Sequence, residues 1–176
     1  EYGTVVFEDL WPVYGDYDMN DLVIDLRYQL CTHANGLVKD VNIQGSLRAA
    51  GASYNNGFSI ELPYEFSNIT ITESSENITP SLVDDNYTIV DLFAGTTALT
   101  GQSSPYAFNT NMDLPYIEPV DFFCKMTLNT MIDHTTLDFG FPYNPFMLQM
   151  GNVQHEIHLI NYPSTSRADP LLFGTE

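Results

Sequence analysis

Basic residues are scarce in this chain, and their scarcity limits the partners it can have. The 176 residues include 5 Lys or Arg against 23 Asp or Glu, which gives a formal net charge of −18. Nucleic-acid binding depends on clustered Lys and Arg that contact phosphates, and the sequence holds no such cluster. Anionic membrane surfaces are disfavoured for the same reason. We therefore expect no nucleic-acid partner.

Long apolar runs and helical periodicity are also missing. No apolar segment approaches the roughly 20 residues of a membrane-spanning helix, so we expect no membrane insertion by this domain. No segment keeps the 3.6-residue period of an amphipathic helix over three turns. The core must therefore be built from strands.

Cysteine occurs only twice, as Cys31 and Cys124. One disulfide is arithmetically possible. However, the apolar alternation places Cys124 on the core face of residues 120–132 and Cys31 on the opposite face of the strand that begins at residue 22. Thiols on opposite faces meet only at a bulge or a strand end. We predict two free thiols, and two cysteines do not fix the redox compartment.

Short segments of alternating hydrophobicity, separated by turns about every ten residues, are typical of a β-sandwich or barrel. We predict an all-β fold, a single jelly-roll-like β-sandwich domain that spans residues 1–176. Asn35-Gly36 is a strong hairpin signal. Residues 73–86 are polar, and residues 95–111 are expected to form a surface loop or an irregular crossover. The expected strands are residues 4–7, 22–30, 39–49, 58–62, 68–72, 87–93, 120–132, 137–141, 146–150 and 155–160.

The strongest functional signal lies in residues 7–28, FEDLWPVYGDYDMNDLVIDLRY. Oxygen-bearing side chains recur there at short spacing between two predicted strands, and pairing of these strands would bring the acids before the loop beside those within it. Several carboxylate and amide oxygens on a flexible backbone are the ligands that Ca²⁺ prefers. The predicted ligands of a structural Ca²⁺ ion are Glu8, Asp9, Asp16, Asp18, Asn20 and Asp21.

This loop matches an EF-hand only at its first ligand positions. Asp16, Asp18 and Asn20 fit those positions, but Asp21 stands where Gly is required and Arg27 where the bidentate Glu is required. We therefore predict a calcium site of another kind, structural rather than catalytic, because no nucleophile or base lies nearby in sequence. The alternative is a turn in which the carboxylates accept hydrogen bonds from backbone amides.

Aromatic residues are interleaved with the acids. Trp11, Tyr14 and Tyr17 are candidates for stacking on sugar rings beside the ion, which indicates an adhesive or lectin-like role. In the alternative interpretation, Trp11 closes the end of the sandwich above the loop.

Residues 155–158, HEIH, do not form a zinc-protease motif. That motif needs two His four apart on a helix, whereas these are three apart on a predicted strand and face opposite sides. Glu156 and His158 share a face and are expected to form a hydrogen-bonded surface pair. Paired carboxylates of the kind that glycoside hydrolases use carry no information here, because 23 acids supply such pairs by chance.

Six segments together resemble the LruC-domain family. They are residues 7–12 (FEDLWP), 15–23 (GDYDMNDLV), 54–58 (YNNGF), 144–146 (NPF), 155–159 (HEIHL) and 162–165 (YPST). The matches extend over nearly the whole chain. The family consists of secreted or outer-membrane lipoproteins of undetermined function, common among Bacteroidota and other Gram-negative bacteria. The acidic run is also similar to a loop of other bacterial surface β-domains that bind calcium.

The resemblance implies an extracellular location on the bacterial outer-membrane surface, with a signal or lipid anchor upstream of residue 1. Residues 1–3 lead almost directly into a strand, which indicates a processing boundary. Family members usually continue beyond the position of residues 173–175, so we expect the full protein to extend past residue 176.

Together these observations predict a non-enzymatic, calcium-binding surface module of a bacterial cell-envelope protein that binds an extracellular glycan or protein, as in adhesion. One alternative is a polysaccharide-active, glycoside hydrolase-like enzyme that uses acids and Trp11 in a cleft. Another is a structural assembly subunit without a small ligand. Glycan binding without turnover distinguishes the module from the enzyme, and an exposed, unpaired edge strand favours the assembly subunit.

Overall fold

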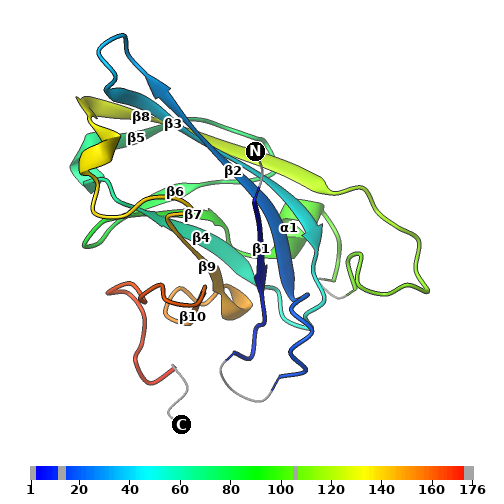
Figure 1. Cartoon of the computed structure of the whole chain (residues 1–176). Coiled ribbons are helices and arrows are strands. Elements are labelled where there is room, and N and C mark those ends of the chain that lie inside the picture. The colour runs from blue at the N-terminus through cyan, green and yellow to red at the C-terminus, as the bar shows by residue number, and fades with distance from the viewer. Residues whose placement is uncertain (1–2, 12–14, 105–106, 173–176) are drawn as a thin grey trace.

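Two antiparallel sheets of five strands each pack face to face in the computed structural model (Figure 1). The structure describes residues 3–11, 15–104 and 107–172. The chain passes repeatedly between the sheets, so that neighbouring strands are often far apart in sequence. The prediction of an all-β sandwich is confirmed.

The first sheet has the order β1 (Gly3–Phe7), β2 (Leu22–Thr32), β3 (Val38–Ala49), β8 (Val120–Ile132) and β5 (Ile69–Ser74). Side chains alternate between the core and the outer face, as expected for a sheet with one buried side. Gly36, with φ of +83°, lies in the turn between β2 and β3, where the left-handed backbone favours glycine. The Asn-Gly hairpin prediction is confirmed.

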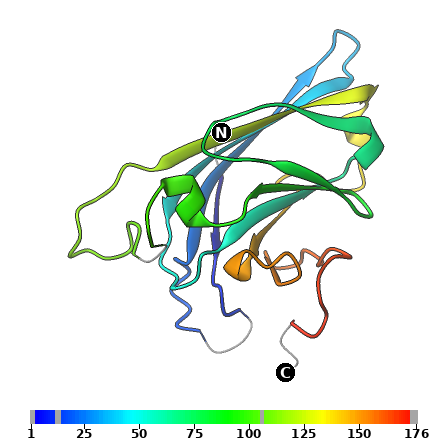
Figure 2. The same ribbon diagram turned by 180° about the vertical axis from the view of Figure 1, so that it is seen from behind.

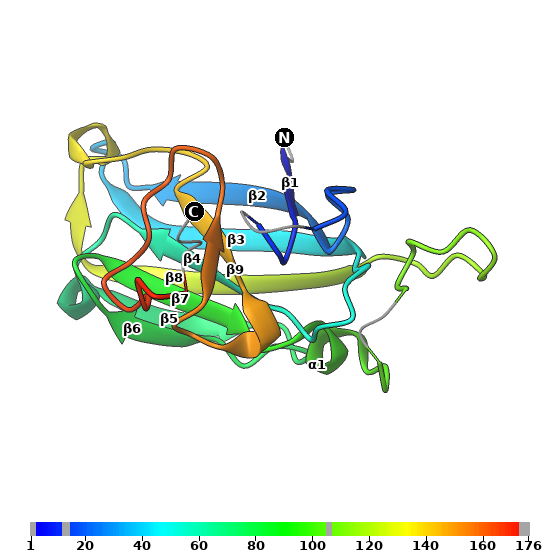
Figure 3. The ribbon, with the colours of Figure 1, turned by 90° about the horizontal axis from the view of Figure 1, so that it is seen from below.

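The second sheet has the order β10 (Glu156–His158), β9 (Asn144–Leu148), β4 (Gly57–Leu62), β7 (Thr88–Phe93) and β6 (Ser81–Asp84). All six residues of β4 are buried. One face of this sheet packs on the core, and the C-terminal segment crosses the other face (Figure 3). The central strand of this sheet therefore has no exposed side.

Aromatic rings from both sheets meet in the core. The ring centroids of Phe7 and Phe58 are 6.1 Å apart, and those of Phe93 and Phe122 are 5.6 Å apart. Gly45 makes room for Phe122, because a Cβ at this position would lie 2.2 Å from the ring. Cys124 is fully buried there, and burial raises the pKa of its thiol to about 12. Cys31 and Cys124 are both free, as predicted.

Two sequence-based assignments of secondary structure are wrong. Residues 137–141 do not form a strand: a 3-10 helix, η2 (His134–Thr136), precedes them, and Asp133 caps it by accepting a hydrogen bond from Thr135 N. Residues 73–86, for which the sequence indicated only polarity, contain the short edge strand β6 (Ser81–Asp84). Residues 95–111 contain a helix, α1 (Thr96–Thr100), which is too short to produce a detectable period.

The remaining helical turns are η1 (Phe66–Asn68) and η3 (Gln149–Gly151). None of the helices in the described part of the chain is long and apolar enough to cross a membrane. The chain just before β8 projects from the sandwich as an exposed loop (Figure 2), in which Met112 is fully exposed.

Candidate metal centre

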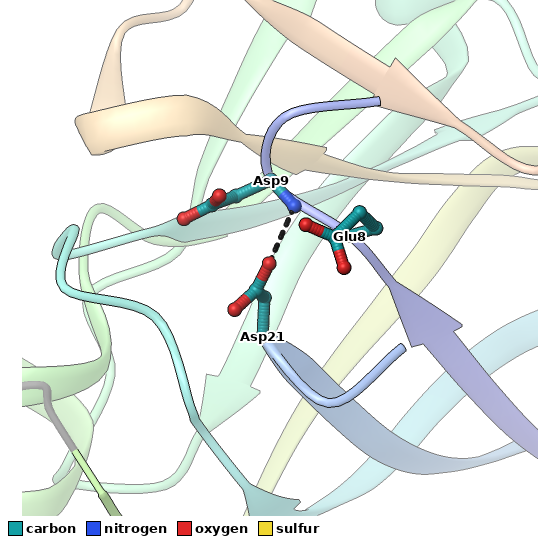
Figure 4. Close-up of side chains that lie close together, drawn as sticks. All are labelled: Glu8, Asp9 and Asp21. Atoms are coloured by element: carbon teal, nitrogen blue, oxygen red, sulfur yellow. Dashed lines mark hydrogen bonds between the residues drawn. The ribbon is translucent and has the colours of Figure 1, made fainter. Parts of the chain in front are cut away.

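Antiparallel pairing of β1 with β2 builds the acidic site. Phe7, the last residue of β1, pairs with Leu22, the first residue of β2. The residues that follow β1 therefore lie beside those that precede β2, and the expected pairing is confirmed. Glu8 and Asp9 leave the end of β1, while Asp21 immediately precedes β2 (Figure 4).

Two groups of carboxylates share Glu8. In the first group, Glu8, Asp9 and Asp21 each offer an oxygen atom within 4.8 Å of the others, and all three residues are buried. In the second, Glu8 lies at the same spacing from Asp16 and Asp18, which are exposed. Ligand oxygens around Ca²⁺ lie about 2.3–2.6 Å from the ion, and hence up to about 5 Å from one another. Either group therefore has a spacing that fits one ion.

Hydrogen bonds hold Asp9 at the junction of the two sheets. Its backbone N–H donates to Asp21 Oδ2 at 2.8 Å, and its Oδ2 accepts from Asn56 Nδ2 at 3.2 Å. Its main-chain oxygen accepts from Gln149 Nε2 at 2.5 Å. Asn56 is fully buried and also accepts from Met150 N at 3.0 Å. These bonds fix one wall of the site.

Asn56 and Gln149 were missed by the sequence analysis. They lie 47 and 140 residues from Asp9, so no local pattern connects them to the acidic run. The one available signal was the YNNGF segment at residues 54–58, in which a buried Asn precedes a strand.

Glu8 has no partner for one of its carboxylate oxygens. Oε2 is buried and has no hydrogen-bond partner among the described residues. The ion pairs between described residues engage Asp25, Asp91 and Glu156 but none of the clustered acids. A buried carboxylate without a counter-charge or donor costs several kcal/mol. Glu8 is therefore expected to take up a proton or to meet a cation.

Burial is the main cause of the raised pKa values in this cluster. It raises the pKa of Glu8 to about 7, and the negative charges of Asp21, Asp16 and Asp9 raise it further. Burial also raises the pKa of Asp9 to about 6, although the hydrogen bond from Asn56 opposes this shift. Without a cation, the cluster therefore retains protons at pH values where exposed carboxylates have lost them.

The loop between the two strands has an unusual backbone. Tyr17 and Met19 have φ values of 53° and 55°, in the left-handed region that non-glycine residues rarely adopt. Asn20 Nδ2 donates to Asp18 Oδ2, and the Asn20 amide lies against Gly51, where a Cβ atom would collide with it. In this arrangement Asn20 is bonded to Asp18 and packs against Gly51.

The aromatic candidates lie on the surface beside the acids. Trp11 is 47% exposed and Tyr17 is 46% exposed, and their ring centroids are 6.0 Å apart at an interplanar angle of 81°. The alternative in which Trp11 covers the end of the sandwich stays a prediction, since about half of this residue is exposed and half is covered. Trp11, Glu8 and Met19 line a cavity of about 340 Å³. Tyr14 lies outside the described residues.

The predicted Glu156–His158 pair is present but is not on the surface. Glu156 Oε2 lies 2.9 Å from His158 Nε2, with both side chains buried. Glu156 also accepts from Thr165 N at 2.9 Å and Thr165 Oγ at 2.6 Å. Arg167 donates two hydrogen bonds to Asp91, at 2.9 and 3.0 Å. These contacts fasten the C-terminal segment to the outer face of the second sheet.

The sequence model of one family, described as a domain of unknown function (DUF4842), matches residues 36–176, which is most of the chain. The chain belongs to this family. No curated protein and no solved structure matches it. The DUF4842 match includes Asn56 and Gln149, which hold Asp9, whereas Glu8 to Asp21 precede it. The DUF4842 region thus contributes one wall of the site, and the preceding residues contribute the carboxylates.

Proposed function

We propose that this protein is a calcium-binding surface module of a bacterial cell-envelope protein, in which Ca²⁺ fixes the segment between β1 and β2. The observation that supports this most is the buried carboxylate of Glu8, whose Oε2 lacks a partner among the described residues. Asp9 and Asp21 present further oxygens within 4.8 Å. A divalent cation supplies the missing partner and offsets the repulsion between these acids.

The donor set favours Ca²⁺ over other common ions. The two groups consist only of carboxylates, whereas structural zinc sites use Cys and His. Mg²⁺ requires near-ideal octahedral geometry at about 2.0–2.1 Å, while Ca²⁺ accepts 6–8 oxygen ligands in irregular arrangements. An irregular loop with exposed Asp16 and Asp18 beside buried Glu8 suits the larger ion.

We infer a binding role rather than a catalytic one. The buried carboxylates of Glu8, Asp9 and Asp21 face one another at a strand junction, an arrangement suited to holding a cation. Exposed Trp11 and Tyr17 lie next to the proposed ion and are suited to contact a glycan or a protein. The location on the bacterial surface rests on the resemblance to LruC-domain proteins.

Isothermal titration calorimetry tests the metal site directly. We expect the EDTA-treated protein to bind Ca²⁺ with defined stoichiometry. Glu8→Gln should abolish binding, because Glu8 belongs to both carboxylate groups. Glu73→Gln is the matched control, since Glu73 is exposed on β5 and lies outside the cluster. Loss of binding in both variants, or in neither, contradicts the proposed site.

A glycan panel with a hydrolysis readout separates the module from the enzyme alternative. We expect binding without product release, and Trp11→Ala should weaken that binding about tenfold or more, because burying a large apolar side chain against a ligand contributes on the order of 1.5–3 kcal/mol. Tyr116→Ala is the control, since Tyr116 is 66% exposed in the projecting loop. Release of shortened glycan would contradict the binding role.

A further inference from the structure

A groove runs between the edge strands of the two sheets, β1 and β10, which lie on the same side of the sandwich (Figure 1). Three cavities of about 500, 340 and 400 Å³ make up this groove, and Leu159 lines all three. Tyr28 lines the first cavity, and Trp11 lines the second and third. Phe7 of β1 and Ile157 of β10 both line the second. The three cavities are therefore adjacent, and apolar side chains make up most of their lining.

No described residue pairs with the edge of β1 beside this groove, a feature that also fits the assembly-subunit alternative. The sequence of β1, GTVVF, has no charge and no proline, and it pairs with β2 without a bulge. Apart from its ladder with β2, the backbone of β1 has no hydrogen-bond partner among the described residues. Natural edge strands are usually blocked by charges, prolines or bulges. Exposed Ile160 and Met19 add apolar surface at the rim.

We propose that this groove binds an extended strand of a partner protein, which pairs antiparallel with β1. The added strand would satisfy the free backbone groups of β1, and every second side chain would enter the groove against Ile157 and Leu159. The five residues of β1 offer roughly 17 Å of edge. This names the partner of the proposed surface module and rests on its binding role, but it does not require the calcium site.

Charge specifies the partner further. The C-terminal end of β1 leads to the five carboxylates of the two groups. One Ca²⁺ ion carries two positive charges and cannot neutralise all five, so this end of the groove stays acidic. Arg27 lines the opposite end. An antiparallel strand places its N-terminal residues beside the acids, so the partner strand should begin with Lys or Arg. A second copy of this chain is disfavoured, because each copy has a net charge of −18.

Two synthetic peptides of identical composition test the proposal. One reads Lys-Lys-Thr-Val-Thr-Val-Thr-Val-Thr, and the other has the same strand with the two lysines at its C-terminal end; both are acetylated and amidated. Nonspecific attraction to an acidic protein is equal for both. We expect the first to bind at least about tenfold more tightly, as measured by fluorescence anisotropy, and to slow hydrogen exchange at β1 amides. Equal affinities, the reverse order or unchanged β1 exchange would overturn the proposal.

Matched variants locate the peptide. Ile160 is 78% exposed at the groove and Leu171 is 81% exposed in the C-terminal segment, so serine should be tolerated at either position. Ile160→Ser should weaken binding of the first peptide about threefold or more, while Leu171→Ser should leave it unchanged. Equal effects of the two substitutions on peptide affinity would overturn the assignment.

A dimer whose β1 amides are protected from exchange without peptide would overturn it as well, because a second copy of the chain would then occupy the edge. Ca²⁺ binding is measured separately by calorimetry. Loss of peptide binding with intact Ca²⁺ binding would therefore overturn this proposal alone, and the reverse result would overturn the metal site alone.

Discussion

Glu8 and Glu156 are equally buried, yet their carboxylates behave in opposite ways. Both residues are 2% exposed. Burial opposes ionisation of Glu156, but hydrogen bonds from His158 and Thr165 outweigh it and lower its pKa. Glu8 lacks such donors, and burial together with neighbouring acids raises its pKa. Glu156 is thus stabilised as a carboxylate by partners within the chain, whereas Glu8 is expected either to hold a proton or to meet a cation.

The raised pKa of Glu8 predicts how stability depends on pH without metal. Its pKa rises from an ordinary value near 4.5 to about 7 on folding, so the folded state retains the proton after the unfolded state has lost it. The free energy of unfolding should therefore fall as pH rises from about 4.5 to 7, by on the order of 3 kcal/mol from this residue. Urea unfolding in EDTA at a series of pH values measures this slope.

Glu8→Gln should reduce the slope, because the amide does not titrate, and the raised pKa of Asp9 accounts for the slope that remains. Saturating Ca²⁺ should also flatten or reverse it, since the proposed ion competes with the proton and keeps the carboxylates ionised. A wild-type slope in EDTA equal to that of Glu8→Gln would contradict the assignment of the raised pKa to this residue.

At the scale of elements, the β1–β2 pair positions the site, and Gly15 allows the intervening loop to approach Glu8. A Cβ atom at Gly15 would lie 2.5 Å from Glu8 Oε1. We expect Gly15→Ala to displace the Glu8 carboxylate and to weaken Ca²⁺ binding about tenfold or more in calorimetry, because metal affinity depends on ligand placement. In Gly140→Ala the added methyl group meets nothing within 4 Å, so binding should be unaffected.

Local patterns predicted most of the strands and the acidic half of the candidate site. The alternation in residues 22–30 and 120–132 matches β2 and β8, and the parity of Cys31 and Cys124 matches their free thiols. Glu8 and Asp21 were expected to meet because their strands pair. Both predictions needed only segments that are close in sequence and the alternation of apolar and polar residues along a strand.

Contacts between distant segments could not be predicted in the same way. His158 and Glu156 were correctly paired, but their burial depends on Thr165 and the C-terminal segment that covers them. Asn56 reaches Asp9 only because β4 lies in the opposite sheet. Residues 137–141 alternate like a strand, yet Leu137 and Phe139 pack on the core from a loop.

At the scale of the molecule, the acidic site joins the two sheets at one end of the sandwich. Asp9 follows β1 of the first sheet and bonds to Gln149, which follows β9 of the second. An ion held by Glu8, Asp9 and Asp21 would therefore stabilise the contact between sheets as well as one loop. With a net charge of −18, any cation also relieves general repulsion, so specificity must be shown against a second divalent ion.

Thermal unfolding of the EDTA-treated protein, with Ca²⁺ or Mg²⁺ titrated in, tests the central claim most directly. A ligand that binds only the folded state adds about 2.7 kcal/mol at a hundredfold excess over Kd, which corresponds to a rise in Tm of roughly 5–10 °C for a domain of this size. We predict that rise with Ca²⁺, a much smaller one with Mg²⁺, and none beyond the Mg²⁺ level in Glu8→Gln. Equal shifts with both ions, or no shift with either, would contradict a specific calcium site and leave the acidic loop as hydrogen-bonded turn structure.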